Sequence, residues 1–129
     1  MMREIVCQMM TSLNGRVDDP YAFVTGVSED QYEDIDAAYA AYDTVVVGRT
    51  TYEEMAAYWP GALAEPAAPG PHARMAERMN RYRKVVLTRD PGFRPAWANA
   101  EAALVGGDAD LVALAAALKA AGSFSPAAP

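Results

Sequence analysis

The sequence predicts a single α/β domain over residues 1–129, with a mostly parallel sheet flanked by helices. Short apolar runs rich in valine and isoleucine, typical of buried strands, alternate with longer segments whose apolar side chains repeat at helical spacing. Strands that alternate with helices in this way are typical of parallel sheets. The 129 residues, of which 52% are apolar, can bury one core but not two.

Strands are expected where β-branched and other apolar residues follow one another: residues 5–10, 45–47, 84–87 and 103–105. The first is followed by Asn14 and Gly15, a pair that favours a tight turn, and the third by a turn at residues 90–92. Cys7 lies in the first predicted strand, which indicates a buried and inert thiol. Because it is the only cysteine, it excludes an intramolecular disulfide.

Four helices are expected: one that begins at Ser28 or Asp30, one from about residue 51 to residues 58–61, one over residues 72–82, and one from Asp108 to Gly122. Pro60 is expected to help end the second, because proline cannot continue the backbone hydrogen bonding. Side chains at helical spacing predict two packing faces: Tyr32, Ile35, Tyr39 and Tyr42, and then Leu111, Leu114, Ala115 and Leu118. The methionines expected mainly in the core are Met9, Met10, Met55, Met75 and Met79.

Charge and composition exclude several classes of protein. A net charge of −6 and an isoelectric point near 4.6 argue against nonspecific binding to nucleic acid or to an anionic membrane. The basic residues within 74–84 therefore predict a solvated helix face. His72 is the only histidine, so no metal site is expected. Neither a signal peptide nor a membrane span is recognisable, which favours a cytoplasmic protein.

Candidate binding residues follow three of the predicted strands: Thr11 after the first, Gly48, Arg49, Thr50 and Thr51 after the second, and Thr88 and Arg89 after the third. The carboxyl ends of parallel strands meet at one edge of a sheet, where ligands bind. A helix N-terminus attracts anions, and arginine pairs well with phosphate oxygens. The pattern favours a nucleotide site. The alternative is an ordinary strand–turn–helix in which Thr51 and Glu54 form a capping box.

Four short motifs carry a family resemblance. Val-Gly-Arg-Thr-Thr-Tyr-Glu stands at residues 47–53 after an apolar strand, and Thr-Ser-Leu-Asn-Gly stands at residues 11–15. Tyr-Trp-Pro at residues 58–60 and Lys-Val-Val-Leu-Thr-Arg at residues 84–89 complete the set. Together they resemble the dihydrofolate reductase-like family, which includes the C-terminal reductase domain of bifunctional riboflavin-biosynthesis deaminase/reductases. The resemblance extends from about residue 3 to residue 122.

The resemblance implies an NADPH-dependent reductase. The hydride would pass to a C=N or C=O bond of a small heterocycle, such as a dihydrofolate-like compound or a pyrimidine of riboflavin synthesis. Eight residues are implied at the cofactor: Thr11 beside the nicotinamide, Gly48, Arg49, Thr50 and Thr51 at the pyrophosphate, and Leu87, Thr88 and Arg89 around the adenosine. Arg89 would meet the 2′-phosphate, and Asn14 would contact the substrate. No catalytic acid is identified, and no metal is implied.

The chain departs from the family in two places. Asn14 stands where aspartate is common, which keeps a hydrogen-bonding side chain but removes a charge. After the last helix the family continues with a Gly-Gly strand, whereas residues 123–129 here are rich in alanine and proline. The resemblance therefore implies an incomplete domain that lacks the C-terminal strands and ends in a disordered tail. The alternatives are a non-catalytic remnant, a nucleotide-binding module, or a homodimer formed through exposed sheet edges.

Overall fold

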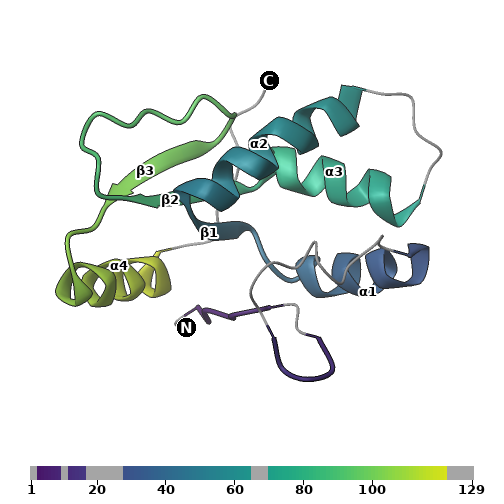
Figure 1. The fold of residues 1–129 in the computed structure, drawn as a ribbon, viewed down its shortest axis with the longest axis horizontal. Helices are drawn as coiled ribbons and strands as arrows, with labels where there is room; N and C mark the ends of the chain where they lie inside the picture. Colours follow the sequence, from purple (N-terminus) through teal and green to yellow (C-terminus); the bar gives the residue numbers. More distant parts are fainter. Residues whose placement is uncertain (1–2, 10–11, 17–27, 65–69, 122–129) are drawn as a thin grey trace.

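The computed structural model describes residues 3–9, 12–16, 28–64 and 70–121 (Figure 1). Within these residues the elements follow in this order: α1 (Glu29–Tyr39), β1 (Thr44–Gly48), α2 (Arg49–Ala64), α3 (Pro71–Arg81), β2 (Arg83–Thr88), β3 (Ala100–Leu104) and α4 (Asp108–Ala120). The mixed α/β fold class is therefore confirmed. Met10, Thr11, the helix end expected at Gly122 and the disordered tail expected over residues 123–129 lie outside the described residues.

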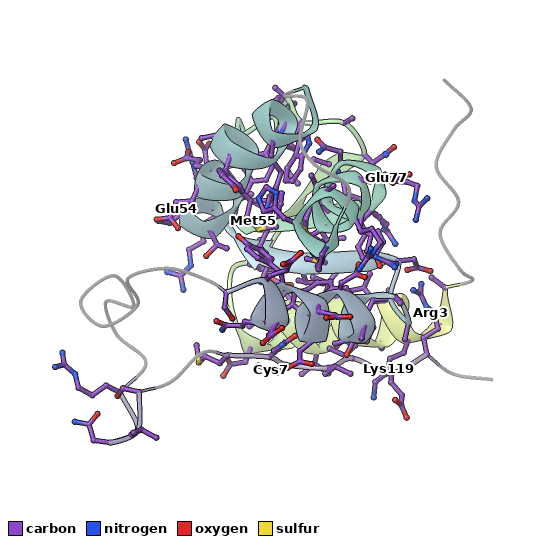
Figure 2. The ribbon with its side chains drawn as sticks, turned by 90° about the vertical axis from the view of Figure 1, so that its right-hand side faces the viewer. Arg3, Cys7, Glu54, Met55, Glu77 and Lys119 are labelled. Carbon is purple, nitrogen blue, oxygen red and sulfur yellow. The ribbon has the colours of Figure 1, made fainter. Side chains whose placement is uncertain are left out.

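The three strands form one parallel sheet in the order β1-β2-β3. Val46 of β1 is aligned with Val85 of β2, and Gly48 with Leu87. The central strand β2 is almost wholly buried, whereas β1 and β3 are half-buried to exposed. Helices α2 and α3 lie together on one side of the sheet, and α4 lies on the other (Figures 1 and 2). The prediction of a parallel sheet flanked by helices holds for these three strands.

The hydrophobic core lies between the sheet and helices α2 and α3. Its buried members come from the helices, the sheet and the connections between them: Tyr52, Met75, Met79, Tyr82, Val86 and Trp97. Half-buried side chains of α1 and of the residues just after it pack against this cluster: Tyr32, Ile35, Tyr39 and Tyr42. The tyrosine face predicted for this helix is thus a packing face, as expected. Burying large aromatic rings is the main contribution that so small a core can make to stability.

One lysine is buried in this core. The side chain of Lys84 is fully buried, and its ammonium lies 4.1 Å from the centre of the Trp97 ring. It donates hydrogen bonds to the carbonyls of Asn80 (3.1 Å) and Ala98 (2.6 Å). Burial lowers the pKa of Lys84 from 10.5 to about 8, because the charged form loses its hydration. This residue was predicted on a solvated face, so that prediction is wrong for Lys84.

A second buried charge joins α1 to α3. Asp36 is 7% exposed and accepts hydrogen bonds from Arg74 Nε and Arg78 Nε, both at 2.8 Å. The two arginines hold the pKa of Asp36 below its ordinary value, despite an opposing effect of burial. Arg78 and Arg74 are therefore partners of a buried carboxylate rather than members of a simple solvated face.

The first predicted strand is absent from the sheet. Residues 3–9 form no strand, and their start is fixed by a hydrogen bond from the Arg3 N–H to the Lys119 carbonyl (3.0 Å). Cys7, expected to be buried, is exposed, and Met9 is 67% exposed. A strand exists only where its backbone groups find a neighbouring strand. No strand of the described residues lies beside this segment, so its apolar sequence did not produce one.

Helix and strand boundaries differ from the predictions at several points. Helix α2 begins at Arg49, which places Thr51 inside its first turn rather than at a cap, and it continues through Pro60 to Ala64. The side chain of Asn80 donates a hydrogen bond to the Trp59 carbonyl (3.0 Å), so α3 supports α2 beside the proline. Tertiary packing here outweighs the helix-breaking tendency of proline.

Strand β3 starts earlier than expected, and α4 has a different N-cap residue from the one predicted. Strand β3 begins at Ala100, because Asn99 adopts a left-handed backbone (φ 61°) that turns the chain into the sheet. Gly107, not Asp108, is the N-cap of α4.

Ser28 caps α1 as predicted, with its Oγ accepting a hydrogen bond from the Gln31 N–H (3.1 Å). The turn at Asn14 and Gly15 is also confirmed.

Replacing Asp36 with asparagine is expected to lower the free energy of unfolding at pH 7 by about 2 kcal/mol, since two charge-assisted hydrogen bonds weaken. The folded-state pKa of Asp36 is lowered, so its contribution exists above the ordinary aspartate pKa and disappears as pH falls through the folded-state value. Urea unfolding of the wild type and D36N at pH 7 and in acid measures this. The exposed neighbour D34N is the matched control and should change little. Equal losses at both pH values would contradict the assignment.

Lys84 predicts a pH dependence of the same sign, but in the alkaline range. Its folded-state pKa is lowered, so above pH 8 the folded protein releases a proton that the unfolded chain keeps until its ordinary pKa. Relative to K84M, the wild type should gain stability between pH 8 and 9.5, by at most about 1.4 kcal/mol per pH unit. Unfolding of K84M, and of K119M at the only other lysine, measures the difference. If the free energy of unfolding has the same pH slope in the wild type and in K84M, the lowered pKa of Lys84 is refuted.

Candidate functional site

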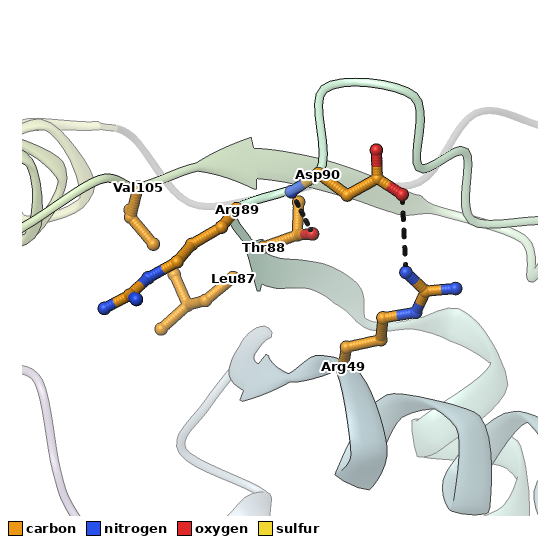
Figure 3. Close-up of a pocket in the computed structure, with 6 residues that line it drawn as sticks. All are labelled: Arg49, Leu87, Thr88, Arg89, Asp90 and Val105. Carbon is orange, nitrogen blue, oxygen red and sulfur yellow. Dashed lines mark hydrogen bonds and ion pairs between the residues drawn. The ribbon is translucent and has the colours of Figure 1, made fainter.

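A pocket opens at the carboxyl end of β2, beside the first residue of α2. It is a shallow depression with a volume of about 420 Å³, and it is largely open to solvent. Six residues line it (Figure 3): Arg49, Leu87, Thr88, Arg89, Asp90 and Val105. All three strands run in the same direction, so their carboxyl ends deliver these residues to one edge of the sheet.

Arg49 stands where β1 passes directly into α2. Its Nε donates a hydrogen bond to Glu53 one helical turn later (3.0 Å), and Nη1 lies 3.5 Å from Asp90 Oδ2. The guanidinium also lies 4.6 Å from the centre of the Phe93 ring. Both ion pairs are about half-exposed, and pairs of this kind stabilise by about 0–1 kcal/mol. A ligand anion could therefore displace either carboxylate at little cost.

The turn after β2 fixes the carboxylate that faces Arg49. The buried Thr88 accepts a hydrogen bond through Oγ1 from the Asp90 N–H (3.0 Å), and Asp90 Oδ1 accepts one from the Gly92 N–H (2.8 Å). This turn holds one carboxylate oxygen and leaves Oδ2 directed at Arg49 (Figure 3). Thr88 is thus a structural support of the pocket wall, with its hydroxyl engaged by the backbone.

Arg89 differs from Arg49 in its surroundings. Its side chain is exposed and points to the opposite side of the pocket from Arg49 (Figure 3). Within the described part of the chain it makes no ion pair, whereas Arg49 makes two. Arginine cannot lose its proton at physiological pH, so Arg89 places a permanent positive charge at this rim. Of the two arginines, Arg89 can therefore bind an anion without first losing an ion pair to a described residue.

The two helices that begin near this edge differ in charge. The first turn of α2 contains no acidic residue and opens with Arg49, Thr50 and Thr51. The first turn of α4 contains Asp108 and Asp110, and Asp110 Oδ2 accepts a hydrogen bond from the Gly106 N–H (2.7 Å). Helix N-termini carry partial positive charge, which acidic side chains neutralise. An anion is therefore favoured at α2 and disfavoured at α4.

The structure brings together four of the eight residues that were assigned to a cofactor: Arg49, Leu87, Thr88 and Arg89. Gly48 lies directly beside them, aligned with Leu87 in the sheet, and its position has room for a Cβ, so the glycine is not required by a close contact there. Thr50 and Thr51 are exposed in the first turn of α2 but do not line the pocket. Thr11 lies outside the described residues.

Asn14 does not reach the pocket. It lies in the exposed turn of residues 12–16, where the Ser12 hydroxyl hydrogen-bonds to its side chain and Gly15 adopts a positive φ of 83°. Figure 1 shows this turn below α1, away from the carboxyl ends of the strands. The turn that the Asn-Gly pair predicts is present, and the substrate contact implied for Asn14 has no counterpart within the described residues.

Two residues of the pocket were missed by the sequence reasoning. Asp90 follows Arg89 immediately, and its role as partner of Arg49 depends on a contact between residues 41 positions apart, which no local pattern reveals. Val105 follows β3, just before Gly106 and Gly107. A Gly-Gly pair after an apolar strand was an available signal, since such pairs allow a close approach to a strand end.

A second cluster of titratable side chains lies at the other end of α2. The imidazole of His72 hydrogen-bonds to the Tyr58 hydroxyl and has its ring centre 5.0 Å from that of Tyr32 and 5.6 Å from that of Trp59. Burial raises the pKa of Tyr32, with a smaller effect of Tyr58. These edge-on and tilted ring contacts join α1, α2 and α3, so the cluster is a packing contact.

Comparison of the chain with models of known protein families, with characterised proteins and with solved structures finds no match. Within the described residues, no helix is both long and apolar enough to cross a membrane. The same part of the chain contains no group of three histidine, cysteine or acidic side chains that could hold a metal ion.

The Arg49–Asp90 contact predicts how an anion competes for the pocket. In D90N the amide oxygen can still accept the Gly92 hydrogen bond, while the charge that faces Arg49 is removed. Inorganic pyrophosphate should then bind about twofold to fivefold more tightly than to the wild type, the range expected from an exposed ion pair. Titration calorimetry at low ionic strength measures the affinities. D34N, with the same change in net charge on α1, is the control; equal gains in both variants would show a general charge effect instead.

Proposed function

We propose that this pocket binds the phosphate-bearing part of NADPH and that the chain is a dihydrofolate reductase-like, NADPH-dependent oxidoreductase located in the cytoplasm. The substrate class remains the one that the family resemblance implies, a small heterocycle with a reducible C=N or C=O bond. The residues proposed to hold the cofactor are those of the pocket rim and of the start of α2: Gly48, Arg49, Thr50, Thr51, Leu87, Thr88 and Arg89.

The observation that carries the proposal is that Arg49 and Arg89, which follow two strands far apart in the sequence, line one pocket from opposite sides. The chain has a net charge of −6, yet two arginines lie at this edge of the sheet. They stand beside the start of α2, whose first turn has no acidic residue, and this arrangement favours an anionic ligand. The location agrees with the general position of ligands in parallel α/β sheets. Arg89, which makes no ion pair among the described residues, is the proposed partner of the 2′-phosphate.

The pocket fits part of such a cofactor. A volume of about 420 Å³ lies within the usual range of small-molecule sites, about 300–1,000 Å³. Leu87 and Val105 supply apolar walls for a ring, and the two arginines supply charges for phosphates. The one opposing group is the Asp90 carboxylate, which an incoming phosphate must displace from Arg49. The exposure of that ion pair makes the displacement inexpensive in free energy.

NADPH would supply the hydride, and the chain's part would be orientation and charge complementarity. Among the residues that line the pocket, Asp90 is the only acid, and it is engaged by Arg49 and by the Gly92 N–H. No proton donor is therefore assigned. This observation favours a second candidate, a module that binds the nucleotide and transfers no hydride.

Thermal unfolding with NADPH and NADH in parallel tests the proposal. Ligand binding to the folded protein stabilises it by about 2.7 kcal/mol at a hundredfold excess over Kd, so Tm should rise clearly with NADPH and less with NADH. R89A should reduce the NADPH shift to the size of the NADH shift, because the 2′-phosphate loses its partner. R81A, which removes an exposed arginine at the end of α3, should behave as the wild type.

Either of two results would contradict the cofactor assignment: equal shifts with both nucleotides, or no shift from a protein that unfolds cooperatively. If NADPH binds selectively, NADPH oxidation followed at 340 nm in the presence of candidate heterocycles separates the reductase from the binding module. Binding without turnover across the substrate class would favour the module.

A further inference from the structure

The sheet has two edges that differ in how they are protected. Native proteins place charged side chains, prolines or bulges on exposed edge strands to prevent pairing with other chains. Strand β3 carries Glu101, which forms an ion pair with Arg83. Strand β1 reads Thr-Val-Val-Val-Gly and has no charge, proline or bulge. Within the described residues it pairs only with β2, and Val46 at its centre is 40% exposed.

Residues 5–9 have a strand-forming sequence without a strand partner. Ile5, Val6 and Met9 are 50%, 53% and 67% exposed, and the segment belongs to no sheet in the described part of the chain. It runs along the outer side of α1 and α4, where Figure 2 labels Cys7 and Lys119. Exposing such a β-branched run in water costs free energy that strand pairing would recover.

These two features match each other in length, charge and register. The segment 5–9 and β1 each contain five residues. Arg3, just before the segment, forms an ion pair with Asp43, just before β1. A parallel alignment that keeps this pair places Ile5 beside Val45, Val6 beside Val46 and Cys7 beside Val47. Ile5 and Cys7 would then extend the core face of the sheet, to which Val45 and Val47 belong.

We propose that two copies of this chain associate by strand exchange, with residues 5–9 of each copy pairing in parallel with the open edge of β1 in the other. A second copy carries both the unpaired segment and the unprotected edge, so one two-fold arrangement satisfies both at once. The Arg3–Asp43 ion pair re-forms between the copies. The resulting surface lies along β1 and, in this register, ends at Gly48 and Arg49, so it adjoins the pocket at the carboxyl end of the sheet.

Sedimentation equilibrium of the full chain tests the association. The expected mass is twice 13.8 kDa at micromolar concentrations. V6P removes a backbone N–H and disfavours the strand, so it should weaken dimerisation by at least about tenfold. V6T keeps the N–H and the β-branched shape, so it should stay within about threefold of the wild type. A monomeric wild type would overturn the proposal, as would equal weakening by V6T and V6P, which would indicate apolar contact without strand pairing.

An engineered disulfide can show which segment pairs with β1 and whether that segment belongs to the other copy. In V47C, mild oxidation with oxidised glutathione should join Cys7 of one copy to the new cysteine of the other, because neighbouring strands bring Cα atoms within disulfide range. Non-reducing electrophoresis should show a linked dimer, and peptide mapping the 7–47 bond. A102C on β3 is the control for nonspecific oxidation and should not link to Cys7. A monomer with an internal 7–47 bond, or a dimer linked only through 7–7, would overturn the proposal.

Discussion

Strands β1 and β2 lie parallel, with Gly48 aligned with Leu87, and this pairing positions the rest of the described structure. It places the start of α2 beside the turn that follows β2, so Arg49 meets Asp90 and shares a pocket with Arg89. The same pairing holds α2 over the sheet, where Tyr52 joins the core and its hydroxyl accepts a hydrogen bond from the Trp97 N–H (3.0 Å). A shift of the register by one residue would turn Val86 out of the core and would separate the two arginines.

The distribution of charge follows from what the core buries. The acidic chain contains eleven arginines and lysines, but several of them are committed within the described structure. Arg74 and Arg78 hold Asp36, Arg83 pairs with Glu101, and Lys84 is enclosed by carbonyls and the Trp97 ring. The pocket at the carboxyl end of the sheet is lined by two arginines and one aspartate, so its lining carries a net positive charge in a chain whose net charge is −6.

The two edges of the sheet connect stability to association. Strand β2 is buried on both sides and needs no further partner, whereas β1 leaves one row of backbone groups unpaired by any described strand. Backbone groups at an open edge must bond to water or to another strand. The apolar segment 5–9 has the same need, and this shared requirement makes the β1 edge a natural place for a second copy to bind.

The sequence by itself determined the elements that have strong local signals. The valine runs of β1 and β2, the Ser28 cap, the Met75 and Met79 face of α3 and the Asn-Gly turn all depend on neighbouring residues, and each was predictable. Four of the eight residues that were assigned to a cofactor line one pocket, as expected from parallel strands that bring their carboxyl ends together. Only the tertiary structure decided that residues 5–9 form no strand, that α2 passes through Pro60, that Lys84 is buried, and that Asp90 faces Arg49. In each case the outcome depends on a partner distant in the sequence, or on its absence from the described residues, and local patterns carry no information about such partners.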